Sequence, residues 1–216
     1  MESGQSELAH ADFLRELDIE NHQIQAHPES ALHYYNRATT FIQLADYGHA
    51  LADFTRAHEL DPADPDAEQG RGYMLFRNGQ YRDAIAAFDA AMALAVRRPR
   101  GNDPTLLSAA CDARAAAGLD LEAARALCDS AVHAAGDADA YASRGYLQFM
   151  RGELADAKQS FLEARNRNNN HASANYGLGV VEVRLGQSEQ GEADMARGRS
   201  LNARNISFYA DAGLRP

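Results

Sequence analysis

One column of small residues recurs along the chain at an almost fixed interval. Four of its five intervals are 34 residues long and the remaining one is 39. These ladder residues are Ala38, Gly72, Cys111, Gly145, Gly179 and Gly213. A fixed period in the thirties is typical of one supersecondary unit that is copied and stacked, because a single copy cannot bury its apolar face alone. The spacing therefore predicts a solenoid, an architecture suited to binding more than to catalysis.

Around each ladder residue the pattern is that of two helices, A and B, joined by a tight turn. The turn column is Ala45, Gly79, Gly118, Gly152 and Gly186. Helix B carries a small slot at Ala50, Ala84, Ala124, Ala157 and Gly191, and a large slot at Phe54, Phe88, Cys128, Phe161 and Met195. A spacing of about four residues places both slots on one helical face. The pattern predicts close approach of the two helices, with the large residue filling the gap between them.

These residues resemble the tetratricopeptide repeat, a helix-turn-helix of 34 residues. The first copy carries the signature most fully, in Tyr34, Ala38, Phe41, Ala50, Phe54, Ala57 and Asp61-Pro62. The resemblance implies an all-α fold, a right-handed α-solenoid of about five such units with an N-terminal capping helix and a C-terminal half-repeat cap. We place the five copies within residues 28–205, at about 31–64, 65–98, 104–137, 138–171 and 172–205.

Both ends of the repeat region are expected to be capped. Residues 1–27 are assigned to the N-terminal capping helix, whose amphipathic part, residues 7–26, ends before Pro28 because proline disfavours helical geometry in the residue before it. Residues 206–216 are assigned to the C-terminal capping helix and tail, where Tyr209 and Gly213 keep the register of a truncated sixth copy. Such ends cover apolar faces that a stack would otherwise expose.

Two copies depart from the pattern. The third follows extra residues around the basic stretch Arg97–Gly101 and places Cys128 in its large slot, so we expect it to form the weakest interface of the stack. Both of its cysteines, Cys111 and Cys128, are expected to be buried and inert, although an exported protein could bond them. The fifth copy has Gly191 and Gly198 in its small slots, which should loosen its second helix.

Charge and composition limit the classes of partner. Acidic residues outnumber basic ones by 31 to 21, and this net charge of −10 disfavours nucleic-acid binding, which needs a basic surface. No stretch is apolar enough to span a bilayer or serve as an export signal. We therefore expect a cytoplasmic protein with no integral membrane association, or a periplasmic one if a signal peptide was removed. Abundant alanine and a preference for arginine over lysine suggest a bacterial source.

The resemblance also implies where a partner would bind, because helix A lines the concave groove in the tetratricopeptide family. Projecting that face onto this chain assigns the groove to Tyr35, Thr39, Tyr73, Phe76, Arg77, Tyr146, Phe149, Met150, Tyr176 and Arg184. On the same face we expect Ile42, Gln69, Ser108, Asp112, Val180 and Val183. Aromatic rings and arginine are typical of interaction hot spots. The alternative is that several of these rings pack against a neighbouring helix instead.

Three arginines form a second row, since Arg37, Arg71 and Arg144 each precede a ladder residue. We expect them to lay their stems along the helix interface and pair with acidic residues in adjacent turns. The lysine, asparagine and arginine clamp with which some tetratricopeptide proteins hold a terminal carboxylate is absent here. Binding of a chaperone tail is therefore disfavoured.

No set of residues suggests catalysis, a metal or a cofactor. The eight histidines never occur in a paired ligand spacing, and neither a phosphate-binding glycine loop nor a nucleophile turn is present. The sequence therefore favours a non-enzymatic scaffold or adaptor that binds a protein or peptide segment in its aromatic groove. The alternative is a structural protein that self-assembles into a homo-oligomer, a dimer or filament, through Tyr209 or the N-terminal helix.

Overall fold

The computed structural model describes residues 2–96 and 103–216, with side chains from residue 10 onward. Within these ranges the chain is entirely helical. The first five helices are α1 Glu2–Ala26, α2 Ala31–Gln43, α3 Tyr47–Leu60, α4 Pro65–Arg77 and α5 Tyr81–Ala95. The others are α6 Pro104–Ala117, α7 Leu121–Ala134, α8 Ala138–Met150, α9 Leu154–Arg167, α10 Ala172–Arg184 and α11 Ser188–Asp211. The predicted helix pairs are thus present in each copy, while the basic stretch Arg97–Arg100 lies outside the described residues.

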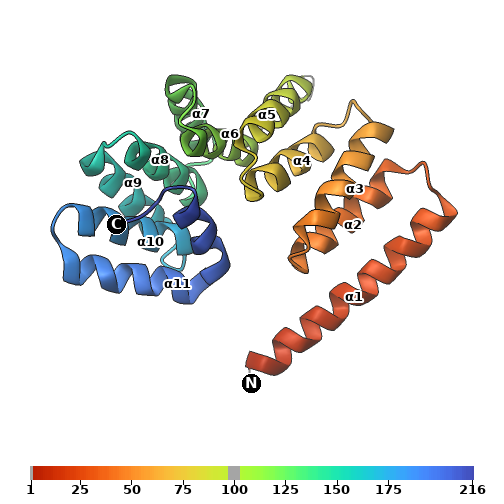
Figure 1. Ribbon diagram of the computed structural model, residues 1–216, viewed down its shortest axis with the longest axis horizontal. Helices are drawn as coiled ribbons and strands as arrows, with labels where there is room; N and C mark the ends of the chain where they lie inside the picture. Colours follow the sequence, from red (N-terminus) through yellow and green to blue (C-terminus); the bar gives the residue numbers. More distant parts are fainter. Residues whose placement is uncertain (1, 97–102) are drawn as a thin grey trace. The chain divides into compact units, whose positions relative to one another are not determined.

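The chain divides into two compact units at the start of the third copy. The N-terminal unit comprises residues 1–101 and the C-terminal unit residues 102–216. Within each unit, the two helices of a copy pack together and helix B of one copy packs against helix A of the next, as for α3 with α4 and α9 with α10. This regular stacking is the predicted repeat fold (Figure 1).

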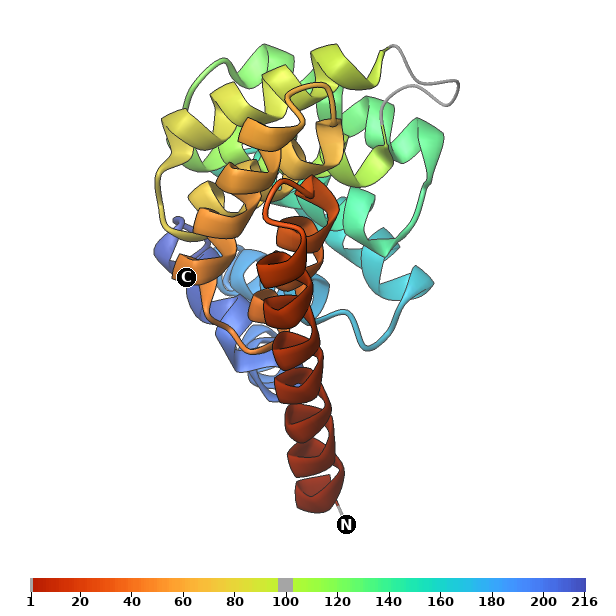
Figure 2. The ribbon, with the colours of Figure 1, turned by 90° about the vertical axis from the view of Figure 1, so that its right-hand side faces the viewer.

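The α1 helix caps the N-terminal unit with only part of its length. It ends at Ala26, and its last turns pack on α2, where Glu20 accepts hydrogen bonds from Asn36 and His33. Its earlier turns extend beyond α2 and α3 (Figures 1 and 2), and Leu14 and Ile19 are 49% and 56% exposed there. The amphipathic face is therefore covered only near the end of the helix.

The A-to-B turns follow the predicted left-handed geometry. Gly79 has φ of +74°, and the corresponding residue of the first copy, Ala45, has φ of +60°. Helix starts are fixed by side-chain caps, since the carboxylates of Asp64 and Asp103 accept backbone N–H groups two residues on, with proline at the first helical position. These local signals explain why the helix boundaries were readable from the sequence.

The ladder glycines Gly72, Gly145 and Gly179 make room for the large residue of their own helix B. A Cβ atom added to Gly72 would lie 2.8 Å from the ring of Phe88, and one added to Gly145 would lie 2.9 Å from the ring of Phe161. The same Phe161 ring also occupies the space next to Gly177, at the start of the following copy. The ring thus joins the two helices of one copy to helix A of the next.

In the third copy this small-to-large contact is replaced by a disulfide. The sulfur atoms of Cys111 and Cys128 are 2.08 Å apart and both residues are fully buried. The expectation of inert thiols is therefore wrong, because the two slots face each other across the α6 and α7 pair. A covalent bond holds the pair that we expected to be the weakest in the stack.

The fifth copy corrects a second expectation. Gly191 and Gly198 do not loosen α11; they bring it against the backbone of α10. A Cβ at Gly191 would lie 2.5 Å from the carbonyl oxygen of Gly179, and one at Gly198 would lie 2.7 Å from the amide nitrogen of Tyr176. Glycine weakens an isolated helix, but here the close approach that it permits compensates through packing.

Two members of the arginine row pair with acids as expected. Arg37 donates to both carboxylate oxygens of Asp53 at 2.7 Å, and Arg71 donates to both oxygens of Glu68. Arg144 instead donates to the hydroxyl of Ser160 at 3.1 Å and lies over the ring of Tyr141. All three are structural residues at helix contacts within their own unit.

The disulfide generates the first prediction. Replacing Cys111 and Cys128 with alanine should lower the free energy of unfolding by about 3 kcal/mol, because the bond closes a loop of 17 residues and restricts the unfolded chain. Urea unfolding of both proteins measures the difference, and added reductant should destabilise the wild type alone. Two reactive thiols in the denatured, unreduced wild-type chain would contradict the bond.

The second prediction compares two helical glycines. Gly191→Ala should destabilise the protein by about 2 kcal/mol, because its Cβ would overlap the α10 backbone. Gly48→Ala in α3 should stabilise it by about 0.5 kcal/mol, since a Cβ there comes no closer than 3.8 Å to any atom and alanine is the better helix former. Urea unfolding gives both values, and a loss at both positions would contradict the packing explanation.

Candidate functional site

The candidate site is a face of the C-terminal unit formed by the A helices α6, α8 and α10. We define this helix-A face by the residues that contact the end of the chain: Asp112, Tyr146, Met150, Ser173 and Arg184. Asp112 and Tyr146 directly follow ladder residues, and Met150 and Arg184 lie five positions after them. The face therefore recurs from copy to copy in register with the ladder.

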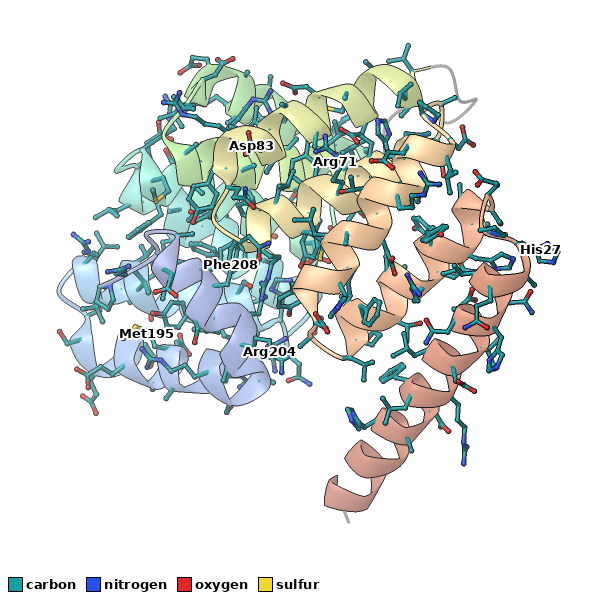
Figure 3. All side chains as sticks on the ribbon, turned by 45° about the vertical axis from the view of Figure 1, so that its right-hand side comes forward. His27, Arg71, Asp83, Met195, Arg204 and Phe208 are labelled. Carbon is teal, nitrogen blue, oxygen red and sulfur yellow. A yellow bond between two sulfur atoms is a disulfide. The ribbon has the colours of Figure 1, made fainter. Side chains whose placement is uncertain are left out.

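The occupant of this face is the C-terminal segment, residues 203–216. The α11 helix is interrupted at Asn202, whose φ of −160° and ψ of 84° are not helical. Met195 lies before this break and Phe208 after it (Figure 3). The Asn202 side chain accepts a hydrogen bond from the amide of Asn205, which caps the helical turns of the segment. One residue thus redirects the chain.

The segment ends in a glycine-dependent turn. Gly213 has φ of +104°, and the amides of Gly213 and Leu214 donate to the carbonyls of Ala210 and Tyr209, which is the Schellman arrangement. Met150 lies beside this turn, since a Cβ added to Gly213 would be 3.1 Å from its terminal methyl. The turn buries Leu214 almost completely.

Hydrogen bonds from four side chains and one contact between aromatic rings attach the segment to the helix-A face. The Tyr209 hydroxyl donates to Oδ2 of Asp112 at 2.7 Å, and the Tyr146 hydroxyl donates to the carbonyl of Ala212 at 2.6 Å. The rings of these two tyrosines meet edge to face, with centroids 5.4 Å apart. Asn205 donates to the hydroxyl of Ser173 at 3.0 Å, and the Arg184 guanidinium donates to the carbonyl of Arg215 at 3.3 Å.

Asp112 has the most perturbed electrostatics of this face. Its side chain is buried with the residue 4% exposed, and burial raises the pKa of Asp112 to about 7, while the hydroxyls of Tyr209 and Ser143 oppose that rise. Asp139 raises this pKa further and His171 lowers it, and these two groups pair with each other at 2.9 Å. The pKa of this enclosed carboxyl thus lies close to neutral pH.

The predicted groove residues of the C-terminal unit are covered, not open. Tyr146 is 1% exposed beneath Tyr209, and Phe149 is buried with Arg184 over its ring. Tyr176 is buried by α11 of its own copy, where Gly198 approaches it. The open aromatic wall that we expected is therefore absent here, because the C-terminal segment and α11 occupy the space.

In the N-terminal unit, two of the predicted groove residues pack against helix B of their own copy, two are half-buried and one is exposed. Tyr35 packs edge to face on Phe54 of α3, and Phe76 is buried beside Tyr81. Thr39 donates to a backbone carbonyl within α2, and Arg77 lies over the Tyr47 ring. Tyr73, by contrast, is 39% exposed.

Helix geometry explains the division. At roughly 100° per residue, positions three before and four after a ladder residue lie within about 60° of it, on the side that packs against helix B. Tyr35, Tyr176 and Phe76 hold such positions. Residues one or five positions after the ladder, such as Tyr73 and Met150, lie about 100° to 140° away and face the other side. The groove predicted from the sequence wrongly included residues that face helix B together with residues on the other side of helix A.

The sequence analysis missed the C-terminal segment as an occupant of the face. Tyr209 was assigned a register position and a contact with a second copy, and Asp112 only a place on the face. The available signal was the apolar pattern of Ile206, Tyr209 and Leu214 in the tail. It could have shown that the tail docks somewhere, but not where.

Comparison with known proteins agrees with this architecture. Residues 34–64 match the tetratricopeptide repeat family. This segment of the chain is a tetratricopeptide repeat. A curated relative is the small glutamine-rich tetratricopeptide repeat-containing protein 2 of Mycosarcoma maydis, 27% identical over 85 residues, which are 39% of this chain and 24% of the relative. The chain therefore spans about a quarter of that relative's length.

Two solved structures share the fold over most of the chain. The type IV pilus biogenesis factor PilW has a TM-score of 0.73 at 18% identity and covers 92% of this chain and 90% of its own. YrrB, a tetratricopeptide protein with an unusual peptide-binding site, has a TM-score of 0.58 at 20% identity and covers 89% and 96%. These likenesses establish the stacked-helix fold.

Two further properties concern the described part of the chain alone. It contains no group of three or more histidine, cysteine, aspartate or glutamate side chains placed to hold a metal ion. Nor does any helix described there combine the length and apolarity needed to cross a bilayer.

The third prediction concerns Asp112. A carboxyl whose pKa is higher in the folded than in the unfolded state contributes stability at low pH, and this contribution is lost as the pH rises through about 7. Asp112→Asn keeps an acceptor for Tyr209 but does not titrate. Between pH 5 and pH 8 the wild type should lose about 2 kcal/mol of unfolding free energy relative to this variant. Parallel urea titrations measure the difference, and a constant gap would contradict the assignment.

Proposed function

We propose that the chain is a non-catalytic scaffold that captures a short helical segment of a partner protein on the helix-A face of its C-terminal unit. Tetratricopeptide repeats are protein-interaction scaffolds, and the residues assigned to the groove from the sequence include Tyr146, Met150 and Arg184 of this face. One observation carries the proposal: a helical segment of the chain itself already occupies the face, with side-chain contacts to both its hydroxyl and its backbone groups.

The contacts combine the two parts that peptide recognition requires. Ile206 and Leu214 supply apolar anchors, each more than nine-tenths buried. Burying such a side chain is worth about 1.5–3 kcal/mol. The tyrosine, serine and arginine side chains of the face supply hydrogen bonds that fix the orientation of the bound segment. An amphipathic helix in a groove is an established recognition mode, in which anchors recur at helical spacing.

The similar structure of YrrB supports the proposal at the level of the fold, since that protein has a peptide-binding site on tetratricopeptide repeats. In the N-terminal unit, Thr39, Tyr73 and Arg77 hold positions equivalent to those of the helix-A face. We include them in the proposal as a candidate contact face of the N-terminal unit by itself.

A second candidate function is self-assembly, and the break at Asn202 favours it. The chain changes direction at this single residue, between two helical stretches. If that residue became helical, α11 would continue straight and carry the C-terminal segment to the helix-A face of a second copy. Light scattering across a concentration series tests this candidate, and a strict monomer at every concentration would rule it out.

The fourth prediction tests the scaffold function directly. A displayed library of helical peptides passed over the immobilised full chain should yield binders, because the face already buries Ile206 and Leu214 and donates hydrogen bonds to the segment that occupies it. Met150→Asp should weaken the selected peptides at least tenfold, since it places a charge where the bound turn lies. Fluorescence anisotropy measures the affinities.

A matched control variant distinguishes an effect on the helix-A face from an effect on the fold. Asp129 is exposed on α7, so Asp129→Asn should leave the affinity within twofold. Equal binding to both variants would exclude the helix-A face as the site, and a library that yields no binder would refute the scaffold function.

A further inference from the structure

The helix-A face contains an acceptor that a tyrosine hydroxyl satisfies. Asp112 Oδ2 accepts from Tyr209, and Oδ1 is buried with no hydrogen-bond partner among the described residues. Removing the donor would leave a buried carboxyl without that bond, and leaving such a group unsatisfied is costly. A segment with phenylalanine in place of tyrosine would fill the same volume but leave Asp112 with the Ser143 hydroxyl as its remaining donor. The face therefore discriminates by the hydroxyl.

Two further groups recognise the end of the bound helix. The last carbonyls of a helix lack partners within it and carry the negative end of its dipole. Tyr146 donates to the carbonyl of Ala212, the cap of this helix, at 2.6 Å, and the positively charged Arg184 donates at 3.3 Å to the carbonyl of Arg215 in the chain that follows the turn. Donors at these places favour a segment whose helical part ends after about two and a half turns, as this one does at Asp211.

The turn itself limits the residues that fit. Gly213 has φ of +104°, a conformation that other residues adopt only with strain, and a Cβ there would lie 3.1 Å from the Met150 methyl, which would have to shift. Leu214 and Ile206 are buried on either side of Tyr209. The occupant therefore has the pattern of residues 206–214, an isoleucine, a tyrosine three positions later, then an alanine-glycine-leucine turn.

The chain's own segment competes for this face. It is tethered through Asn202, and a short tether of this kind corresponds to an effective concentration in the millimolar range. A free segment of equal intrinsic affinity would bind only when the tethered one is weakened or outcompeted.

We infer that the helix-A face of the C-terminal unit selects a partner helix carrying this tyrosine and glycine-leucine pattern, with Asp112 reading the tyrosine hydroxyl, and that residues 203–216 are a built-in competitor. The inference rests on the proposed function and deepens it, because it names the chemistry of the partner segment and the element that limits access.

The fifth prediction uses the full chain and a fluorescein-labelled peptide with the sequence of residues 203–216. The chain variant Tyr209→Ala/Leu214→Ala weakens its own docked segment while leaving the face intact. We expect the peptide to bind this variant at least ten times more tightly than the wild type, as measured by fluorescence anisotropy. Leu214→Ala alone provides a second weakened chain, and circular dichroism verifies that each variant is folded.

Peptide variants test whether Asp112 recognises the tyrosine hydroxyl. On the weakened chain, a peptide with phenylalanine at the Tyr209 position should bind at least ten times more weakly than the parent peptide. A peptide with alanine at the exposed Ser207 position should bind within twofold. Adding Asp112→Ala to the weakened chain should reduce the preference for tyrosine over phenylalanine to less than threefold.

Each outcome decides a separate part. Equal affinity for wild type and weakened chains would refute competition by the segment, and a tyrosine preference that survives Asp112→Ala would refute the role of Asp112. If library peptides bind the helix-A face but the 203–216 peptide does not, this inference falls and the scaffold function stands. If neither binds, the scaffold function falls as well.

Discussion

The contact between a small residue of helix A and a large residue of helix B determines most of this structure. Where Gly145 meets the Phe161 ring, the two helices approach closely, and the same ring reaches Gly177 of the following copy. One side chain thereby sets the spacing inside a repeat and between repeats. The 34-residue period of the sequence follows from this contact, because each copy must present the same small and large residues to its neighbour.

The same contact fixes the rotation of helix A and so decides which residues can bind anything. Once the ladder residue faces helix B, a residue one position later lies about 100° away and a residue four positions later only about 40° away. Repeat number, helix boundaries and packing slots were therefore predictable from the sequence. Tyr35 and Tyr176 were wrongly assigned to the groove, because the resemblance to the family was applied to helix A as a whole without considering this angle. When the angle is considered for each residue, Tyr73 and Tyr146 lie on a different side of helix A from Tyr35 and Tyr176.

The docking of the C-terminal segment could not be predicted in the same way. Tyr209 and Asp112 are 97 residues apart in the chain, and no local pattern pairs them. The register of Gly213 suggested a regular sixth helix A, but the break at Asn202 turns the segment across α6, α8 and α10. A periodic signal describes contacts between neighbours in a stack. It carries no information about a segment that leaves the stack and returns to an earlier copy.

Asp112 shows how stability and recognition diverge on this face. The equivalent positions of the next two copies hold Tyr146 and Val180, which are buried without a formal charge. A buried carboxyl is a poor choice for stability alone, and burial raises its pKa to about 7. The Tyr209 hydroxyl offsets part of this cost together with Ser143. The residue that weakens the empty face is thus the one that makes the filled face selective, because an occupant without the hydroxyl leaves that part of the cost uncompensated.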